Sequence, residues 1–195
     1  SILRLSDPEE TDLGLNMYGL SESFLDRLMK IRGHRPGERC LLIGQADGET
    51  AFARNVKKQV KTVCRHHRGM YLTSYPMKKW YHGRFSDPYM REDLNDYGII
   101  IDTLESGVTW DNLPRLYQGV RAYIKSRRQT ICMTHASHFY PQGTNLYFIF
   151  IIKETDTGAF LSFHRGVIDE IVRCGGSLSH HHEIGRASCR ERVCH

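Results

Sequence analysis

The sequence lacks the features of a membrane-spanning or secreted chain. None of its apolar runs reaches the roughly 20 residues that a bilayer-spanning helix needs. The longest run, LYFIFII (146–152), has the length of a strand. The N-terminus, SILRLSDPEETD, has neither the basic start nor the apolar core of a signal peptide, and it lacks an initiator methionine. We therefore expect a cytoplasmic location and a chain whose first residue, Ser1, lies inside a longer protein.

Strong charge and paired cysteines are also missing. The net charge is +5, and it is expected to be spread through the chain, with one dense basic patch, KSRRQ (125–129). A nucleic-acid-binding domain would show a basic face or stripe, so no nucleic-acid partner is expected. The 6 cysteines form no CxxC pair and show no metal-ligand spacing. They are predicted to be reduced thiols, as in a cytosolic protein.

What the sequence does contain is an alternation of helical and extended patterns. Apolar periodicity and breakers predict helices over 21–31, 49–66, 109–127 and 157–176 and strands over 39–46, 97–105, 129–139 and 145–153, followed by an extended segment, 177–181. In the second helix the apolar residues Phe52, Val56, Val60 and Val63 are expected to face a core. The order predicts an α+β fold, a mixed and largely antiparallel sheet with helices packed on one face.

A long stretch between two of these elements, 68–96, is expected to be irregular. It is rich in tyrosine, tryptophan, lysine and arginine. Structureless loops of such length within a compact domain are usually functional, so the stretch is predicted to be a lid or a binding element.

The C-terminal string EIGRASCRERV (183–193) shows no periodicity and follows abruptly on a well-patterned segment. All eleven of its residues agree with the in-frame translation of a common short-read sequencing adapter. We therefore expect the native sequence to end near His182 and residues 183–195 to be a non-native tail, which is excluded from fold reasoning.

Three motifs share a resemblance. GGSLSHHH (175–182), YPQGTNLYFIF (140–150) and PYMREDLNDYGIIIDTLESGVTWDNL (88–113) resemble the C-terminal domain of FAD-linked oxidases, in its alkyldihydroxyacetonephosphate (alkylglycerone-phosphate) synthase-like branch. The resemblance covers nearly all of 1–182 and implies a C-terminal substrate or cap domain with ferredoxin-like repeats. It also implies that FAD is bound mostly by a domain upstream of Ser1. The implied reaction exchanges the acyl group of acyl-dihydroxyacetone phosphate for a fatty alcohol, without net redox change.

The resemblance also assigns the candidate site. It places the catalytic tyrosine at Tyr147, further catalytic groups near the flavin at His180, His181 and His182, and a substrate-binding arginine at Arg91. From the residues alone, Tyr147 would be a half-buried strand tyrosine and Arg91 a solvated arginine. A guanidinium suits a phosphate or carboxylate, and a phenol needs hydrogen-bonding or cationic neighbours to carry protons near neutral pH. Other members of an anion pocket are expected in the 68–96 stretch, at Lys78, Lys79, His82 and Arg84.

No metal site is expected. On an extended strand adjacent histidines alternate faces, so only His180 and His182 point the same way, and two ligands do not make a zinc site. Related hydroxyacid dehydrogenases carry HxGDGNxH where this chain has YPQGTNLY, so Tyr140 and Tyr147 stand at the histidine positions. Their other ligand, a glutamate, is replaced by His181. Neutral phenols are weak ligands, which favours the synthase-like branch.

Two alternatives stay open at this point. One is an FAD-dependent oxidoreductase acting on a hydroxy acid or a related alcohol. The other is a non-catalytic α+β binding module. For the enzyme, the expected ligand is a lipid-like or small anionic substrate. The full-length protein is expected to be a homodimer, and peripheral contact with a membrane is one alternative for its location. The fragment alone is expected to be inactive.

Overall fold

The computed structural model describes residues 2–83 and 87–178, and the chain divides into two compact units after Asp87. The first unit contains β1 (Ile2–Ser6), α1 (Pro8–Met17), α2 (Phe24–Ile31), β2 (Leu41–Gln45), α3 (Thr50–His66) and α4 (Tyr75–Gly83). The second contains α5 (Asp87–Asn95), β3 (Ile99–Thr109), α6 (Leu113–Ser126), β4 (Ile131–Ser137), β5 (Gly143–Lys153) and α7 (Thr157–Arg173). In the described part of the chain, no helix is both long and apolar enough to cross a membrane.

In the first unit, side-chain caps fix where the first helices begin. Asp7 accepts a hydrogen bond from the Glu10 N–H at 2.9 Å, with Pro8 at the start of α1. Ser23 does the same for α2, accepting from the Asp26 N–H at 3.2 Å. β1 and β2 form an antiparallel pair in which Ile2 lies opposite Gln45. Neither β1 nor α1 is predicted by the sequence pattern.

A buried ion cluster ties the segment before β2 to the two helices. Arg39 donates to Asp12 at 2.8 Å and to Asp26 at 2.6 Å, and the Lys30 ammonium lies 2.7 Å from Asp26. Asp26 is 2% exposed. The hydrogen bonds from Lys30 and Arg39 lower the pKa of Asp26 from 3.8 to about 2 despite its burial. The cluster therefore holds this part of the chain through charge, since the apolar core of the unit is small.

The expected packing of α3 is wrong, although the helix itself is confirmed. No residue of α3 is buried. Phe52, Val60 and Val63 are exposed and Val56 is half-buried. The periodicity identified an apolar side of the helix, but no core lies against it.

The prediction that 68–96 is irregular is also wrong, because two helices, α4 and α5, occupy much of this stretch. In each helix the second residue is a proline, Pro76 in α4 and Pro88 in α5. A proline in the first turn costs no intrahelical hydrogen bond and presets the backbone for a helix. These prolines therefore favour the beginning of a helix at two points of a stretch that was expected to have no regular structure.

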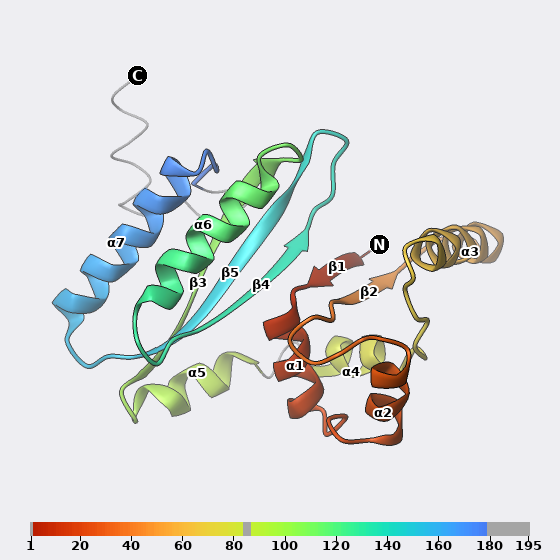
Figure 1. Ribbon diagram of the computed structural model, residues 1–195, viewed down its shortest axis with the longest axis horizontal. Coiled ribbons are helices and arrows are strands. Elements are labelled where there is room, and N and C mark those ends of the chain that lie inside the picture. Colours follow the sequence, from red (N-terminus) through yellow and green to blue (C-terminus); the bar gives the residue numbers. More distant parts are fainter. Residues whose placement is uncertain (1, 84–86, 179–195) are drawn as a thin grey trace. The chain divides into compact units, whose positions relative to one another are not determined.

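The second unit is an antiparallel sheet with two helices on one face, as Figure 1 shows. β5 is central and pairs with β4 on one side and β3 on the other. α6 packs on all three strands and against α7. The predicted α+β class and helices on one face are confirmed, and the described strand pairs are all antiparallel.

The core of this unit lies between the helices and the sheet. The even-numbered residues of β5, among them Phe148 and Phe150, are fully buried there with Leu116 of α6 and Ile171 of α7. Because strand side chains alternate, the odd-numbered residues of β5 point to the opposite face of the sheet. That opposite face carries the polar residues considered next.

After α7, Gly175 adopts a left-handed φ of +76°, which ends the helix where the Gly-Gly pair predicts it. The chain then turns toward β3. The Ser177 N–H donates to the Gly107 carbonyl at 3.0 Å, and the Gly107 N–H donates to the Ser177 hydroxyl at 2.9 Å.

Candidate active site

Tyr147 lies at the centre of the sheet, on the face opposite α6 and α7. It is an odd-numbered residue of β5, and the pairing register puts Glu105 of β3 on one side of it and His135 of β4 on the other. Residues directly opposite in antiparallel strands share a face, with Cβ atoms about 5 Å apart. The three side chains therefore form one row across the sheet, which we call the Glu105–Tyr147–His135 row.

A carboxylate is buried at one end of this row. Glu105 is 5% exposed, and its Oε2 accepts a hydrogen bond from the Asn145 amide nitrogen at 2.9 Å. Buried carboxylates are normally paired in this way because an unpaired charge in a low dielectric is very costly. The Asn145 Oδ1 is itself buried and has no hydrogen-bond partner in the described part of the protein. The row thus ends in a hydrogen-bonded carboxylate, and Asn145 beside it carries an acceptor without a described partner.

These neighbours keep the phenol protonated. Desolvation, followed by the hydrogen bond to Glu105 and its negative charge, raises the pKa of Tyr147 well above its ordinary value, and Asn145 opposes this more weakly. The phenol was expected to need cationic or hydrogen-bonding neighbours in order to carry protons. Glu105 is a hydrogen-bonding neighbour whose charge favours the neutral phenol, so in this arrangement Tyr147 donates a hydrogen bond to Glu105.

His135 completes the row from the other side. Its ring stacks on Tyr147 with centroids 4.8 Å apart and ring planes at 12°, and the side chain is 9% exposed. The stacking fixes the plane of the Tyr147 ring, since a buried aromatic pair restricts rotation of both rings. Tyr147 is therefore a positioned phenol in contact with a carboxylate and an imidazole.

The three tail histidines lie outside the described residues. Their catalytic role therefore stays a prediction, and only the segment that precedes them is described. Both edges of β5 are occupied by β3 and β4, and the chain at Ser177 meets β3 instead. The contact is at Gly107, two residues from Glu105 along the same strand.

Arg91 lies at an exposed position of α5. In the described part of the chain its guanidinium has no hydrogen bond or ion pair. α5 leads into the far end of β3 at Ile99, six residues or roughly 20 Å of strand from Glu105. That Arg91 binds the substrate of the Tyr147 site therefore stays a prediction.

The other expected anion-binding residues belong to the first unit. Lys78 and His82 are exposed on α4, where the His82 Nδ1 lies 2.7 Å from the Lys78 carbonyl. The Lys79 side chain and Arg84 lie outside the described part. Their share in an anion pocket stays a prediction.

Metal ligands are not clustered in the described ranges, where no three His, Cys, Asp or Glu side chains converge. Tyr140 is 48% exposed, in the turn between β4 and β5. The four described cysteines, Cys40, Cys64, Cys132 and Cys174, are free thiols.

Glu105, His135 and Asn145 are the site residues that the sequence interpretation missed. All three lie on segments predicted as strands or at their ends, and each is a polar residue within an apolar pattern. Such residues signal buried polar groups. They lie beside Tyr147 because of the register between strands that are distant in sequence. The residue pattern of a single strand does not predict that register.

Comparison with known proteins identifies the family of the chain. The family model described as "FAD linked oxidases, C-terminal domain" matches residues 1–191. That match extends past His182, so the predicted non-native origin of the tail stays a prediction.

Among curated relatives, the alkyldihydroxyacetonephosphate synthase of Dictyostelium discoideum is 30% identical, over 95% of this chain and 33% of its own length. The synthase of Trypanosoma brucei brucei is 23% identical, over 93% of this chain and 31% of its own. The uncharacterized FAD-linked oxidoreductase YgcU of Escherichia coli K12 is 25% identical, over 78% of this chain and 35% of its own. The chain thus spans about a third of the length of these relatives.

The expected location of the cofactor domain, upstream of Ser1, stays a prediction. Ser1 itself lies outside the described residues, and the structure begins its description at Ile2. The relatives are about three times as long as the segment that matches this chain, so they have room for a further domain.

A solved structure of an alkyldihydroxyacetonephosphate synthase superposes with a TM-score of 0.74 and 27% identity, covering 91% of this chain and 34% of that one. The family match, the relatives and the superposition all cover both units. The chain therefore belongs to the family of C-terminal domains of FAD-linked oxidases.

Proposed function

We propose that this chain is the substrate domain of an FAD-dependent, alkyldihydroxyacetonephosphate synthase-like enzyme, which replaces the acyl group of acyl-dihydroxyacetone phosphate by a fatty alcohol. The observation that carries the proposal is the Glu105–Tyr147–His135 row, with the phenol hydrogen-bonded to a buried carboxylate. The resemblance had already placed the catalytic tyrosine at this position. The 30% identity to a synthase over 95% of the chain supports the same branch.

The row provides a route for one proton. As the ether C–O bond forms, the incoming alcohol must lose its hydroxyl proton, while the fatty acid departs as a carboxylate that needs none. A phenol with a raised pKa is a poor base by itself. Tyr147 can take the alcohol proton on its oxygen as its own proton passes to the Glu105 carboxylate. A positioned proton transfer of this kind typically contributes about 10²–10⁴-fold to the rate.

His135 and Asn145 position this relay. Stacking on His135 fixes the plane of the phenol, and the Asn145 amide, by donating to Glu105, leaves the remaining lone pairs of that carboxylate for Tyr147. Alignment matters because a misplacement of about 1 Å can cost about 10²-fold in rate.

FAD is the cofactor of the family. The Asn145 Oδ1 has no described partner, but Asn145 is 0% exposed, so this acceptor is not open to the flavin ring. When bound, the flavin supplies the electrophilic and nucleophilic ring chemistry that amino-acid side chains lack. The residues of this chain hold the substrate side and move the proton.

The charged groups of the substrate are assigned to side chains away from the row. Arg91 binds the phosphate, for which its planar fork of donors is suited. His180, His181 and His182 are assigned to the catalytic groups near the flavin, as the resemblance implies.

The proposal is tested in a full-length flavoprotein that joins residues 1–182 to an FAD-binding domain from a synthase relative, placed before Ser1. The assay supplies acyl-dihydroxyacetone phosphate and a fatty alcohol and measures ether product by mass spectrometry, with an electron-accepting dye present. Ether product with released fatty acid and no dye reduction is expected.

A second function has one supporting observation, the 25% identity to the FAD-linked oxidoreductase YgcU. In this case the row would take the hydroxyl proton of a hydroxy acid, and a bound flavin would supply the redox chemistry. Dye reduction by a hydroxy acid, without ether product, would support this oxidoreductase and reject the synthase.

A further inference from the structure

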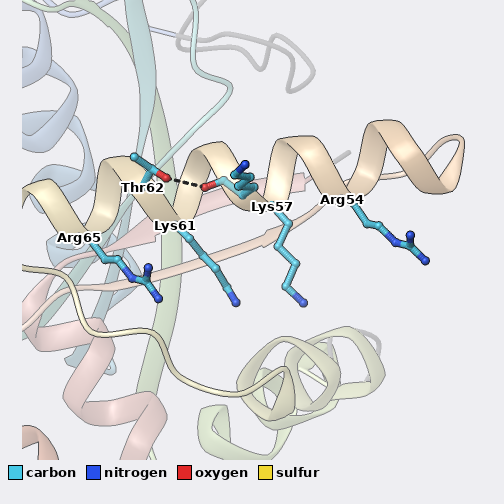
Figure 2. A pocket seen from close by; sticks show the side chains of 6 residues that line it. Arg54, Lys57, Lys61, Thr62 and Arg65 are labelled. Atoms are coloured by element: carbon cyan, nitrogen blue, oxygen red, sulfur yellow. Dashed lines mark hydrogen bonds between the residues drawn. The ribbon is translucent and has the colours of Figure 1, made fainter.

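The helix α3 carries its basic side chains on one side. Its lysines and arginines recur every three or four residues, so they share one side of the helix. Figure 2 shows Arg54, Lys57, Lys61 and Arg65 projecting from that side. Together with Lys58 and Thr62 they line a shallow surface pocket.

No acidic residue within the same stretch of sequence neutralises this side. Between 50 and 86 the sequence has nine lysines and arginines and neither aspartate nor glutamate. The whole chain has 27 lysines and arginines, so 18 remain outside this stretch, against 22 aspartates and glutamates. The rest of the chain is therefore net negative. The acid-free stretch is longer and more strongly charged than the basic patch expected at 125–129.

The opposite side of α3 is apolar, and no core of the described residues packs against it. Phe52 is 55% exposed, Val63 is 59% exposed and Val60 is 38% exposed. One basic side chain contacts the segment after α3: the Lys61 ammonium lies 3.6 Å from the ring centroid of Tyr71. Tyr71 is itself 54% exposed. α3 thus presents a basic side and an opposite apolar side, and burial among the described residues does not explain the apolar one.

We propose that α3 is a membrane-contact helix that lies in the surface of an anionic lipid bilayer. Its lysines and arginines face the lipid phosphates, and Phe52, Val60 and Val63 enter the boundary between headgroups and acyl chains. Amphipathic helices with a basic polar face and low overall hydrophobicity bind in this way. Charge complementarity decides for lipid, since phosphates at a membrane surface attract each nearby lysine or arginine. The proposal is independent of the ether-forming chemistry.

The test is co-sedimentation of the 195-residue chain with vesicles. One set is phosphatidylcholine alone and the other is an equal mixture of phosphatidylcholine and phosphatidylglycerol. Binding to the mixed vesicles, and much less to phosphatidylcholine, is expected. The double variant Lys57→Gln/Lys61→Gln should bind the mixed vesicles about thirty-fold more weakly, at about five-fold for each lysine.

Two matched controls separate α3 from charge or hydrophobicity in general. Arg128→Gln/Arg165→Gln removes the same charge from exposed positions of the second unit and should leave binding nearly unchanged. Phe52→Ser should weaken binding roughly five-fold. Phe24→Ser, at an 83% exposed phenylalanine of α2, should not. Circular dichroism checks that each variant is folded, which is expected because none of the replaced side chains is buried.

Three outcomes would overturn the proposal. The first is equal weakening by the two double variants, and the second is binding to a duplex DNA oligonucleotide without binding to vesicles. The third is vesicle binding by the 195-residue chain that disappears in the full-length flavoprotein, since another part of the protein would then cover α3.

Discussion

Replacing Glu105 by glutamine isolates the electrostatic effect on Tyr147 without changing the size of the side chain. Glutamine keeps an oxygen that can accept from Asn145 but removes the negative charge that favours the neutral phenol. A hydrogen bond to a charged acceptor is worth about 1.5–3 kcal/mol. One pH unit corresponds to about 1.4 kcal/mol, so the pKa of Tyr147 should fall by about one to two pH units.

The assay is an NMR titration of the protein with ring-labelled tyrosine, in which Tyr147→Phe assigns the resonance. In the wild type, Tyr147 should stay protonated at a pH where an ordinary tyrosine, with a pKa of about 10, has ionised. In Glu105→Gln its pKa should lie closer to that ordinary value. The control Glu92→Gln makes the same charge change at an exposed position of α5 and should leave Tyr147 unaffected. Ionisation of the wild-type Tyr147 at the ordinary value would refute a phenol held neutral by Glu105.

Three further predictions concern stability and substrate binding. Asp26→Asn should destabilise the first unit by about 3 kcal/mol because it leaves Arg39 poorly paired. In the wild type, the stability that Asp26 contributes should be present above about pH 4 and lost as the pH falls toward 2. Denaturant titration at each pH measures both effects. Gly143→Ala should cost about 2 kcal/mol or more in the free energy of unfolding, since the new Cβ would lie 2.0 Å from the Val108 carbonyl oxygen, and an unchanged unfolding midpoint would contradict this. Arg91→Ala should raise KM for the anionic substrate by about 10–100-fold with little effect on kcat, because it removes a charge-assisted contact. A fall in kcat of the same size with an unchanged KM would contradict a role of Arg91 in substrate binding.

Much of the fold could be predicted from periodicity, and the failures have physical causes. The strand that became β5 and the helix that became α7 were predicted because both carry a continuous apolar pattern bounded by turn residues. α3 was predicted as a helix but given a core that it lacks, since periodicity shows which side is apolar and not whether anything packs on it. The two helices within 68–96 were missed because each is short and contains a proline, which disfavours a helix everywhere except in the first turn, where Pro76 and Pro88 lie.

The candidate site could be predicted only in part. The resemblance selected Tyr147, and the structure surrounds it with polar groups from two other strands. Glu105 and His135 lie 42 and 12 residues away in sequence, and only the register of β3, β4 and β5 brings them together. The sign of the pKa effect on Tyr147 was also beyond prediction, because it depends on a neighbouring carboxylate.

The central claim is that Tyr147 passes the proton of the alcohol to Glu105 during ether formation. Its most direct test is the rate of ether formation by the full-length flavoprotein carrying Tyr147→Phe, which removes one oxygen and keeps the ring stacked on His135. We expect a loss of about 10²–10⁴-fold in kcat with unchanged FAD content. A variant that forms ether at the wild-type rate would contradict the claim.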